Sequence, residues 1–133
     1  MNQKLKIFVV DNDRIYLTVT QKLLSKISTS FSVSIFYDGI EAFEAIETLI
    51  ESKPIELPDL ILLDLDMPIM DGWDFLESYN KIGVNNYKSI PIYIVTSSIA
   101  LEDINKSNNY QDVLGYLVKP LNLETLEEIV LKN

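Results

Sequence analysis

The sequence predicts an α/β domain: a doubly wound, five-stranded parallel sheet in the order 2-1-3-4-5 with helices on both faces. The first observation is that strand patterns and helix patterns alternate five times along 133 residues. The second is that several strand patterns are continuous apolar runs, which are typical of parallel strands buried on both faces. Right-handed crossovers leave few topologies for such a chain, and this order is the simplest of them.

The first strand and helix are predicted at the start of the chain. Residues 5–10 are β-branched and aromatic, which favours a strand. Residues 13–27 predict a helix because apolar side chains recur at helical spacing. These apolar positions are Ile15, Val19, Leu23, Leu24 and Ile27. The polar stretch at 28–30 ends the helix.

The second strand, the second helix and the third strand are predicted next. Residues 31–36 alternate apolar residues with serine and predict a strand. Asp38 and Glu41 form a capping-box pattern, so we expect a helix from there to about residue 51. Residues 60–63 are four apolar residues in a row, which predicts a buried strand. Pro68 then requires an extended loop.

The rest of the chain predicts three helices and two strands. Residues 73–83 carry aromatic and apolar side chains at helical spacing, and 91–95 predict a fourth buried strand. Residues 101–108 predict a weak helix because they contain Asn and Ser. Residues 113–118 predict the fifth strand. Asn122 can cap the last helix, which runs close to the end of the chain.

The composition excludes several kinds of site. The chain has no cysteine and no histidine, which removes disulfides, thiolate ligands and imidazole bases. Its 20 acidic and 11 basic side chains give a net charge of −9, which argues against direct binding to nucleic acid. No apolar run approaches a membrane span and residues 1–4 do not resemble a signal peptide, so we expect a cytoplasmic protein.

Polar side chains follow four of the five predicted strands at the point where each strand ends. Asp11 and Asn12 follow the first strand, and Asp64 follows the third. Thr96 ends the fourth strand, and Lys119 follows the fifth. Because the carboxyl ends of parallel strands meet at one edge, we expect these side chains to share a cleft. Any one of them could simply mark where its strand reaches solvent, so the convergence of all of them indicates the site.

Such a cleft suits phosphoryl transfer with a divalent cation. Mg²⁺ is usually held by one or two carboxylates together with water and phosphate oxygens. A lysine can neutralise a phosphoryl oxygen, a threonine hydroxyl can donate a hydrogen bond to one, and an aspartate can form an aspartyl phosphate. In the alternative interpretation, Lys119 forms only a structural ion pair with Asp64.

These motifs resemble the receiver domain of two-component response regulators, which has the flavodoxin-like (βα)5 fold. The most specific part is residues 58–64, PDLILLD, followed by residues 67–72, MPIMDG. Residues 118–120, VKP, and 94–97, IVTS, are the second and third matches. The resemblance covers nearly the whole chain and implies a single receiver domain over residues 1–133, with no output domain.

For the metal, the resemblance implies Mg²⁺ bound by Asp11, Asn12, Asp64 and the backbone carbonyl of Asp66. Asn12 departs from the family pattern, which has an acidic residue at this position. An amide oxygen can ligate Mg²⁺ but brings no negative charge to the pocket. We therefore expect weaker Mg²⁺ binding than a full acidic pair gives.

For the phosphoryl group, the resemblance implies that Asp64 is the acceptor and that Lys119 and Thr96 contact the phosphoryl oxygens. Tyr116 matches the family's aromatic switch position. Phosphorylation would draw Thr96 toward Asp64, and Tyr116 would turn inward into the vacated space. The Lys119–Pro120 peptide bond is typically cis in this family.

The resemblance also implies partners. A sensor histidine kinase or a histidine phosphotransfer protein would supply the phosphoryl group, since this chain has no histidine. We expect no enzyme activity beyond self-phosphorylation from a phosphodonor and slow autodephosphorylation. The output would be binding to an unidentified downstream protein, or onward transfer in a phosphorelay, from a monomer or weak homodimer without membrane contact.

Two other functions fit part of the pattern. A haloacid-dehalogenase-like phosphatase has a D-x-D motif after a buried strand, which Asp64 and Asp66 match. Its nucleophile, however, lies on the first core strand and its Mg²⁺ acids come later in the chain. A degenerate receiver would bind a partner without being phosphorylated, and Asn12 favours this alternative. A flavodoxin-type nucleotide binder would need a Gly- or Ser-rich loop after residues 5–10, where the sequence has none.

Overall fold

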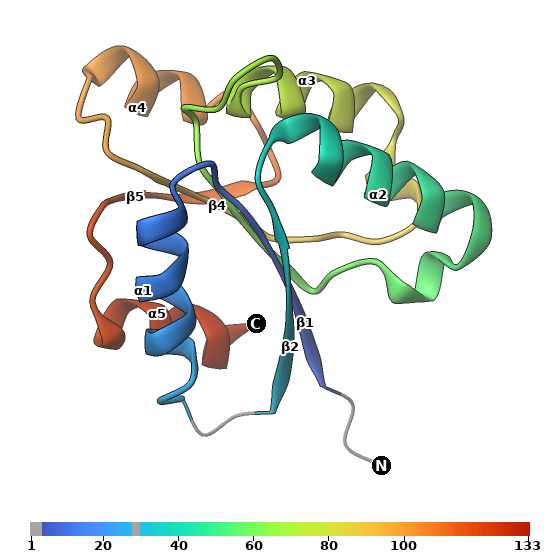
Figure 1. Ribbon diagram of the computed structural model, residues 1–133. Helices are drawn as coiled ribbons and strands as arrows, with labels where there is room; N and C mark the ends of the chain where they lie inside the picture. The colour runs from blue at the N-terminus through green and yellow to red at the C-terminus, as the bar shows by residue number, and fades with distance from the viewer. Residues whose placement is uncertain (1–3, 28–29) are drawn as a thin grey trace.

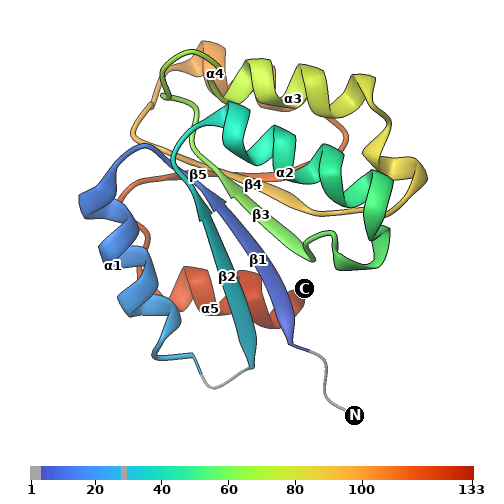
Figure 2. The ribbon, with the colours of Figure 1, turned by 45° about the vertical axis from the view of Figure 1, so that its right-hand side comes forward.

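A computed structural model describes residues 4–27 and 30–133 and shows a parallel sheet between two layers of helices (Figure 1, Figure 2). The strands are β1 (Leu5–Val10), β2 (Phe31–Phe36), β3 (Leu60–Leu63), β4 (Ile92–Thr96) and β5 (Val113–Val118). The α-helices are α1 (Arg14–Leu24), α2 (Gly39–Ser52), α3 (Gly72–Lys81), α4 (Leu101–Ser107) and α5 (Leu123–Lys132). The sheet has the order β2-β1-β3-β4-β5 with parallel neighbours, so the predicted fold class and strand order are confirmed.

The two helix layers use opposite faces of the sheet. Helices α2, α3 and α4 lie on one face, and α1 and α5 lie on the other (Figure 1). On β1, Phe8 and Val10 belong to the core under α2 and α3. Ile7 and Val9 belong to the core against α1 and α5, as the alternation of side chains along a strand requires. All of β3 is buried because both of its faces are covered.

The first helix is shorter than its sequence pattern predicts. The apolar spacing predicts a helix over residues 13–27, but α1 ends at Leu24. A single turn follows, in which the Ile27 backbone nitrogen donates to the Leu24 carbonyl oxygen at 3.0 Å. Ile27 is buried all the same, so a turn brings it to the core where the sequence suggested a longer helix. Ser28 and Thr29, where the helix was expected to break, lie outside the described residues.

Helix α1 buries only part of the apolar stripe predicted from the sequence. Ile15 and Val19 are 80% and 40% exposed. The buried positions are Leu17, Thr20 and Leu24, which also recur at helical spacing. The buried face of α1 therefore combines Leu24 of the predicted stripe with Leu17 and Thr20, and apolar periodicity alone does not locate it.

The polar caps in the sequence mark helix starts in the structure. The Asp38 carboxylate accepts a hydrogen bond from the Glu41 backbone nitrogen at 2.8 Å, and Asn122 accepts one from Thr125 at the same distance. Helix α4 has seven residues and no side-chain cap, in agreement with its weak sequence pattern. Two short 3-10 helices, η1 (Pro54–Glu56) and η2 (Val84–Asn86), were not expected. Across the described part of the chain, no helix combines the length and apolarity needed to span a bilayer.

Candidate functional site

The carboxyl edge of the sheet brings together three of the predicted site residues. The register places Val10 beside Leu63, so Asp11 and Asp64 leave neighbouring strands at the same level. Lys119, at the end of β5, reaches both of them. Its Nζ lies 2.8 Å from Asp11 Oδ2 and 3.3 Å from Asp64 Oδ2. The lysine therefore bridges the two carboxylates, and the Lys119–Pro120 peptide bond that follows is cis.

These three side chains are almost removed from solvent. Lys119 is 9% exposed, Asp11 4% and Asp64 6%. Burial raises the pKa of Asp11 to about 6, although the hydrogen bond from Lys119 acts in the opposite direction. Burial opposes the charge on Lys119, but its hydrogen bond to Asp11 and the charges of both carboxylates outweigh this and raise its pKa. When both acids are ionised, one ammonium faces two carboxylates, so the cluster favours an additional cation.

The backbone orients both carboxylates. Asp11 Oδ1 accepts a hydrogen bond from the Asp13 backbone nitrogen at 2.8 Å. Asp64 Oδ1 accepts a longer one, 3.4 Å, from the backbone nitrogen of Asp66. In each residue, one oxygen is held by the following turn and the other faces Lys119. The short loops after β1 and β3 therefore set the geometry of the cluster.

Thr96 and Tyr116, the two predicted switch residues, both contact Ser98. Thr96 is fully buried, and its Oγ1 accepts a hydrogen bond from the Ser98 backbone nitrogen at 3.3 Å. The Tyr116 hydroxyl donates to the Ser98 carbonyl oxygen at 2.9 Å, and its ring packs against the core under α2 and α3. Tyr116 thus already reaches the loop that follows Thr96.

Asn12 and Asp66, the other predicted metal residues, are exposed. In the described residues, no three or more Asp, Glu, His or Cys side chains form a group that could hold a metal ion. The acidic part of a metal site here would therefore be limited to the pair Asp11 and Asp64. Further ligands would have to be an amide oxygen, backbone carbonyls and water, which are all normal for Mg²⁺.

Sequence reasoning missed Tyr16. Lys119 Nζ lies 4.3 Å from the centroid of its ring. The Tyr16 hydroxyl oxygen also accepts a hydrogen bond from the Leu121 backbone nitrogen at 3.2 Å. The available signal was an aromatic residue in the first turn of the helix that follows Asp11. The pattern of apolar spacing gave this residue no role.

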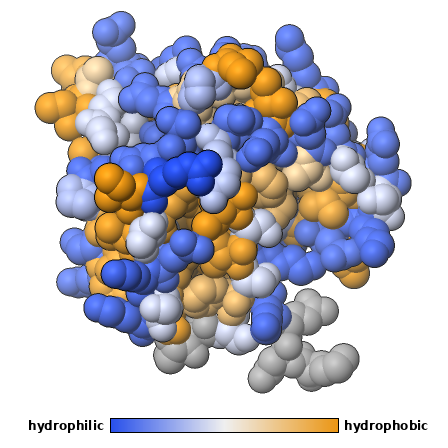
Figure 3. All heavy atoms as spheres, in the orientation of Figure 1, coloured by the Kyte–Doolittle hydropathy of each residue, from blue (hydrophilic) through white to orange (hydrophobic). Residues whose placement is uncertain are grey.

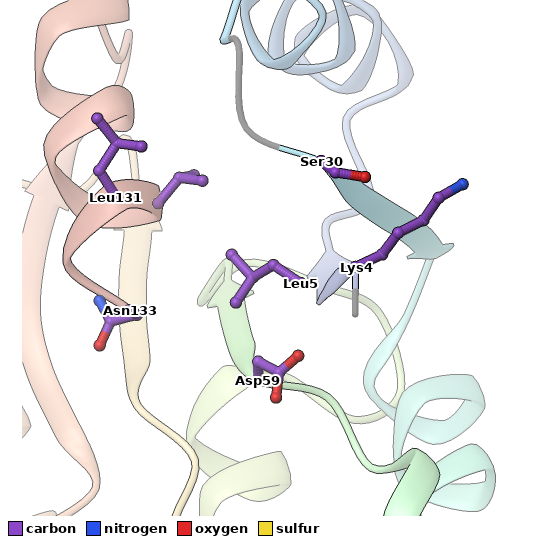
Figure 4. Close-up of a pocket in the computed structure, with 7 residues that line it drawn as sticks. Lys4, Leu5, Ser30, Asp59, Leu131 and Asn133 are labelled. Carbon is purple, nitrogen blue, oxygen red and sulfur yellow. The ribbon is translucent and has the colours of Figure 1, made fainter. Parts of the chain in front are cut away.

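The opposite edge of the sheet has a shallow hollow between the starts of β1 and β2 and the end of α5 (Figure 4). Asp59 lies beside it and is fully engaged in structural contacts. It accepts a hydrogen bond from the Lys6 backbone nitrogen at 2.8 Å and from Lys88 Nζ at 2.7 Å. Asp59, the first aspartate of the PDLILLD stretch, therefore links the starts of β1 and β3 to the segment before β4. Asp64, the second, belongs to the candidate site.

Comparison with known proteins identifies the family. Residues 7–131 match the response regulator receiver domain. The probable transcriptional regulator ycf29 of Porphyra purpurea is 32% identical over 93% of this chain, which spans 54% of that protein. Among solved structures, the phosphorylated cyanobacterial phytochrome response regulator RcpA is 31% identical, with a TM-score of 0.76 over 96% of this chain and 89% of that one. The Mn²⁺-bound response regulator Rcp1 is 28% identical, with a TM-score of 0.76 over 95% and 88%. This chain belongs to the response regulator receiver domain family.

Proposed function

We propose that this receiver domain is a phosphoacceptor switch in a two-component phosphorelay. Asp64 would take a phosphoryl group from a phosphohistidine of a sensor histidine kinase or a histidine phosphotransfer protein. The strongest support is the buried cluster of Asp64, Asp11 and Lys119. It combines a carboxylate nucleophile, a cation to neutralise phosphoryl oxygens and a second carboxylate for a metal.

In the proposed step, a carboxylate oxygen of Asp64 attacks the phosphorus, and the phosphorus–nitrogen bond of the donor breaks. The bonding electrons leave with the imidazole, which takes a proton from water as neutral histidine is restored. Lys119 Nζ, 3.3 Å from Asp64 Oδ2, is placed to neutralise a phosphoryl oxygen. A carboxylate nucleophile has no proton to remove, so the reaction does not need a histidine base.

Mg²⁺ is the metal we propose for this site. Asp11 and Asp64 would hold it together with Asn12 and the backbone carbonyl of Asp66. When bound, it would supply positive charge to the oxygens of the transferred phosphoryl group. The paired carboxylates support this proposal, and so does the Mn²⁺ bound in the related response regulator Rcp1.

Phosphorylation would be transmitted through the loop between β4 and α4. The Thr96 hydroxyl would turn toward the phosphorylated Asp64 and give up its hydrogen bond from Ser98. Tyr116 would then pack further inward beneath the same loop. Because both residues contact Ser98, a charge change at Asp64 would bias the position of this loop and of α4.

The output would be binding to a downstream protein. Ile99 and Leu101 are exposed at the start of α4, where Figure 3 shows apolar surface. Leu114 and Val118 are exposed on β5, which neighbours α4. Exposed apolar side chains on the elements next to the switch support a protein partner on this side of the molecule.

Phosphate uptake tests the proposal directly. The protein is incubated with Mg²⁺ and acetyl phosphate, and acid-labile phosphate is measured on wild type, Asp64→Asn and Asp112→Asn. We expect Asp64→Asn to abolish uptake because it removes the nucleophile. Asp112→Asn should behave like wild type, since Asp112 lies just before β5, at the amino ends of the strands and away from Asp64. Uptake that persists in Asp64→Asn would refute the assignment.

One alternative keeps a specific observation in its favour. Asn12 reduces the negative charge of the proposed metal site, because the family has an acidic residue at this position. This favours a degenerate receiver, which would bind a partner without being phosphorylated. A folded wild-type protein that takes up no phosphate at any Mg²⁺ concentration would establish this alternative. Membership of the receiver family argues against a haloacid-dehalogenase-like phosphatase, which steady turnover of a phosphomonoester would reveal.

A further inference from the structure

Tyr16 makes two contacts that link the start of α1 to the segment after β5. Its ring faces the Lys119 ammonium, with 4.3 Å between Nζ and the ring centroid. Its hydroxyl oxygen accepts a hydrogen bond from the backbone nitrogen of Leu121 at 3.2 Å. One side chain therefore holds both the charged tip of Lys119 and the backbone that follows it.

The surroundings of Tyr16 strengthen its attraction to Lys119. The ring lines a small cavity beneath the acidic cluster, together with Asp11, Asp64 and Leu121. Cation–π attraction is larger in such desolvated places than on an open surface. Burial also raises the pKa of the Tyr16 phenol above its ordinary value.

We propose that Tyr16 is a positioning residue for the phosphorylation of Asp64, acting through Lys119. This inference rests on the function proposed above. Lys119 has to stay near Asp64 in the resting state and then follow an oxygen of the incoming phosphoryl group. The Tyr16 ring attracts the ammonium independently of the two carboxylates. Its attraction therefore counts most when Lys119 moves toward a phosphoryl oxygen and the ion pairs of the resting state, at 2.8 and 3.3 Å, weaken.

Tyrosine makes two contacts at this position that an aliphatic residue cannot make. The ring attracts the ammonium, and the hydroxyl fixes the backbone at Leu121, two residues beyond Lys119. A leucine at position 16 would fill part of the space but would provide neither contact. Phenylalanine would keep the attraction to Lys119 and lose only the hydrogen bond.

The test measures the rate of phosphorylation by acetyl phosphate in Mg²⁺ for wild type, Tyr16→Leu and Tyr16→Phe. We expect Tyr16→Leu to lower the maximal rate constant about five- to thirtyfold, the size of a desolvated cation–π contact. The donor concentration for half-maximal rate should stay unchanged, because Tyr16 acts through Lys119 and not on the donor. Tyr16→Phe should recover most of the rate.

A spectroscopic measurement separates positioning from general stability. Protons on the Lys119 side chain near the ring should show a ring-current shift in wild type and in Tyr16→Phe, and lose it in Tyr16→Leu. The matched control is Tyr37→Leu, which removes another tyrosine facing a cation, Arg14, at 4.1 Å. This control should phosphorylate at the wild-type rate. If Tyr16→Leu does not fold, Tyr16→Met gives the same comparison with a longer side chain that lacks a ring.

The outcomes distinguish this inference from the function on which it rests. Wild-type phosphorylation in a folded ring-free variant, with Asp64→Asn inactive, would overturn the role of Tyr16 and leave the phosphoacceptor assignment standing. A Tyr16→Phe variant as slow as Tyr16→Leu would also overturn it, because the effect on the rate would then not come from the attraction between the ring and Lys119. Phosphorylation of Asp64→Asn would instead refute the proposed function itself.

Discussion

Asp11 and Asp64 divide their two carboxylate oxygens in the same way. In each residue, Oδ1 accepts a backbone hydrogen bond from two residues further on, and Oδ2 faces Lys119 Nζ. Both carboxylates are therefore oriented by the chain itself, which would reduce the reorganisation that the proposed transfer step requires. The cluster still carries excess negative charge when both acids are ionised, because one ammonium faces two carboxylates.

That imbalance makes Asn12 a sensitive position. Changing Asn12→Asp adds a carboxylate next to Asp11, and we expect Mg²⁺ to bind about tenfold more tightly, or about 1.4 kcal/mol. Calorimetric titration with Mg²⁺ gives the affinity, and Trp73 fluorescence offers a second readout. Asn80→Asp, which adds the same charge on the exposed side of α3, should leave the affinity nearly unchanged. Unchanged or weaker binding in Asn12→Asp would contradict the metal assignment.

The raised pKa of Asp11 predicts a pH dependence of stability. The folded protein binds this proton with a pKa of about 6, against 3.8 for an unperturbed aspartate. The folded state is therefore favoured below about pH 4, and this contribution is lost as the pH rises through about 6. We expect the free energy of unfolding of wild type, relative to Asp11→Asn, to fall by on the order of 3 kcal/mol between pH 4 and pH 7. Urea unfolding at several pH values measures it, and a difference that stays constant or rises would contradict the prediction.

At the scale of elements, α2 and α3 both begin against the loop that follows β3. A Cβ on Gly72 would lie 2.6 Å from the Asp64 carbonyl oxygen and 2.8 Å from Leu65 Cα. A Cβ on Gly39 would lie 2.5 Å from the Met70 carbonyl oxygen. The helices can approach the loop this closely because these two positions lack side chains. The backbone of Asp64 is thereby packed directly against the start of α3.

This close approach predicts the effect of Gly72→Ala. The added methyl group meets backbone atoms that cannot move aside, so we expect a loss of about 1–3 kcal/mol of stability in urea unfolding. Gly115→Ala is the comparison, because a Cβ there meets the Tyr93 side chain at 2.8 Å, and a side chain can turn away. Gly72→Ala should also slow phosphate uptake, since it displaces Asp64. An equal loss of stability in both variants would contradict the prediction, because it would show that contact with the backbone of Asp64 costs no more than contact with the Tyr93 side chain.

For the whole molecule, the order of the sheet leaves β5 at one edge, beside α4. An edge strand with exposed apolar residues is a natural place for a second chain to pair. Much of the surface is acidic, and the net charge of −9 opposes association elsewhere. Self-association should therefore be weak and confined to the edge with exposed apolar side chains.

Analytical ultracentrifugation of Leu114→Lys tests this expectation. We expect the average mass of wild type to rise with concentration and that of Leu114→Lys to stay monomeric, because a charge on the edge strand prevents pairing. Ile55→Lys removes an equally apolar exposed side chain in η1, away from β5, and should behave like wild type. Equal association of the two variants would place the contact elsewhere.

The order of elements and most of the site follow from short stretches of sequence. Four apolar residues before Asp64 predict a strand buried on both faces, and polar residues after the strands predict the edge where they meet. Both inferences work because strand alternation, helix spacing and proline restraints act over a few residues. The sequence by itself therefore determined the parallel sheet, its order and the meeting of Asp11, Asp64 and Lys119.

The tertiary structure alone decided how the site is supported. It placed Tyr16 against Lys119 and Leu121, paired Asp59 with Lys6 and Lys88, and turned Ile15 to solvent. These features depend on distances between segments far apart in the chain, and local periodicity carries no information about them. The raised pKa of Asp11 has the same origin, since burial depends on everything packed around a side chain.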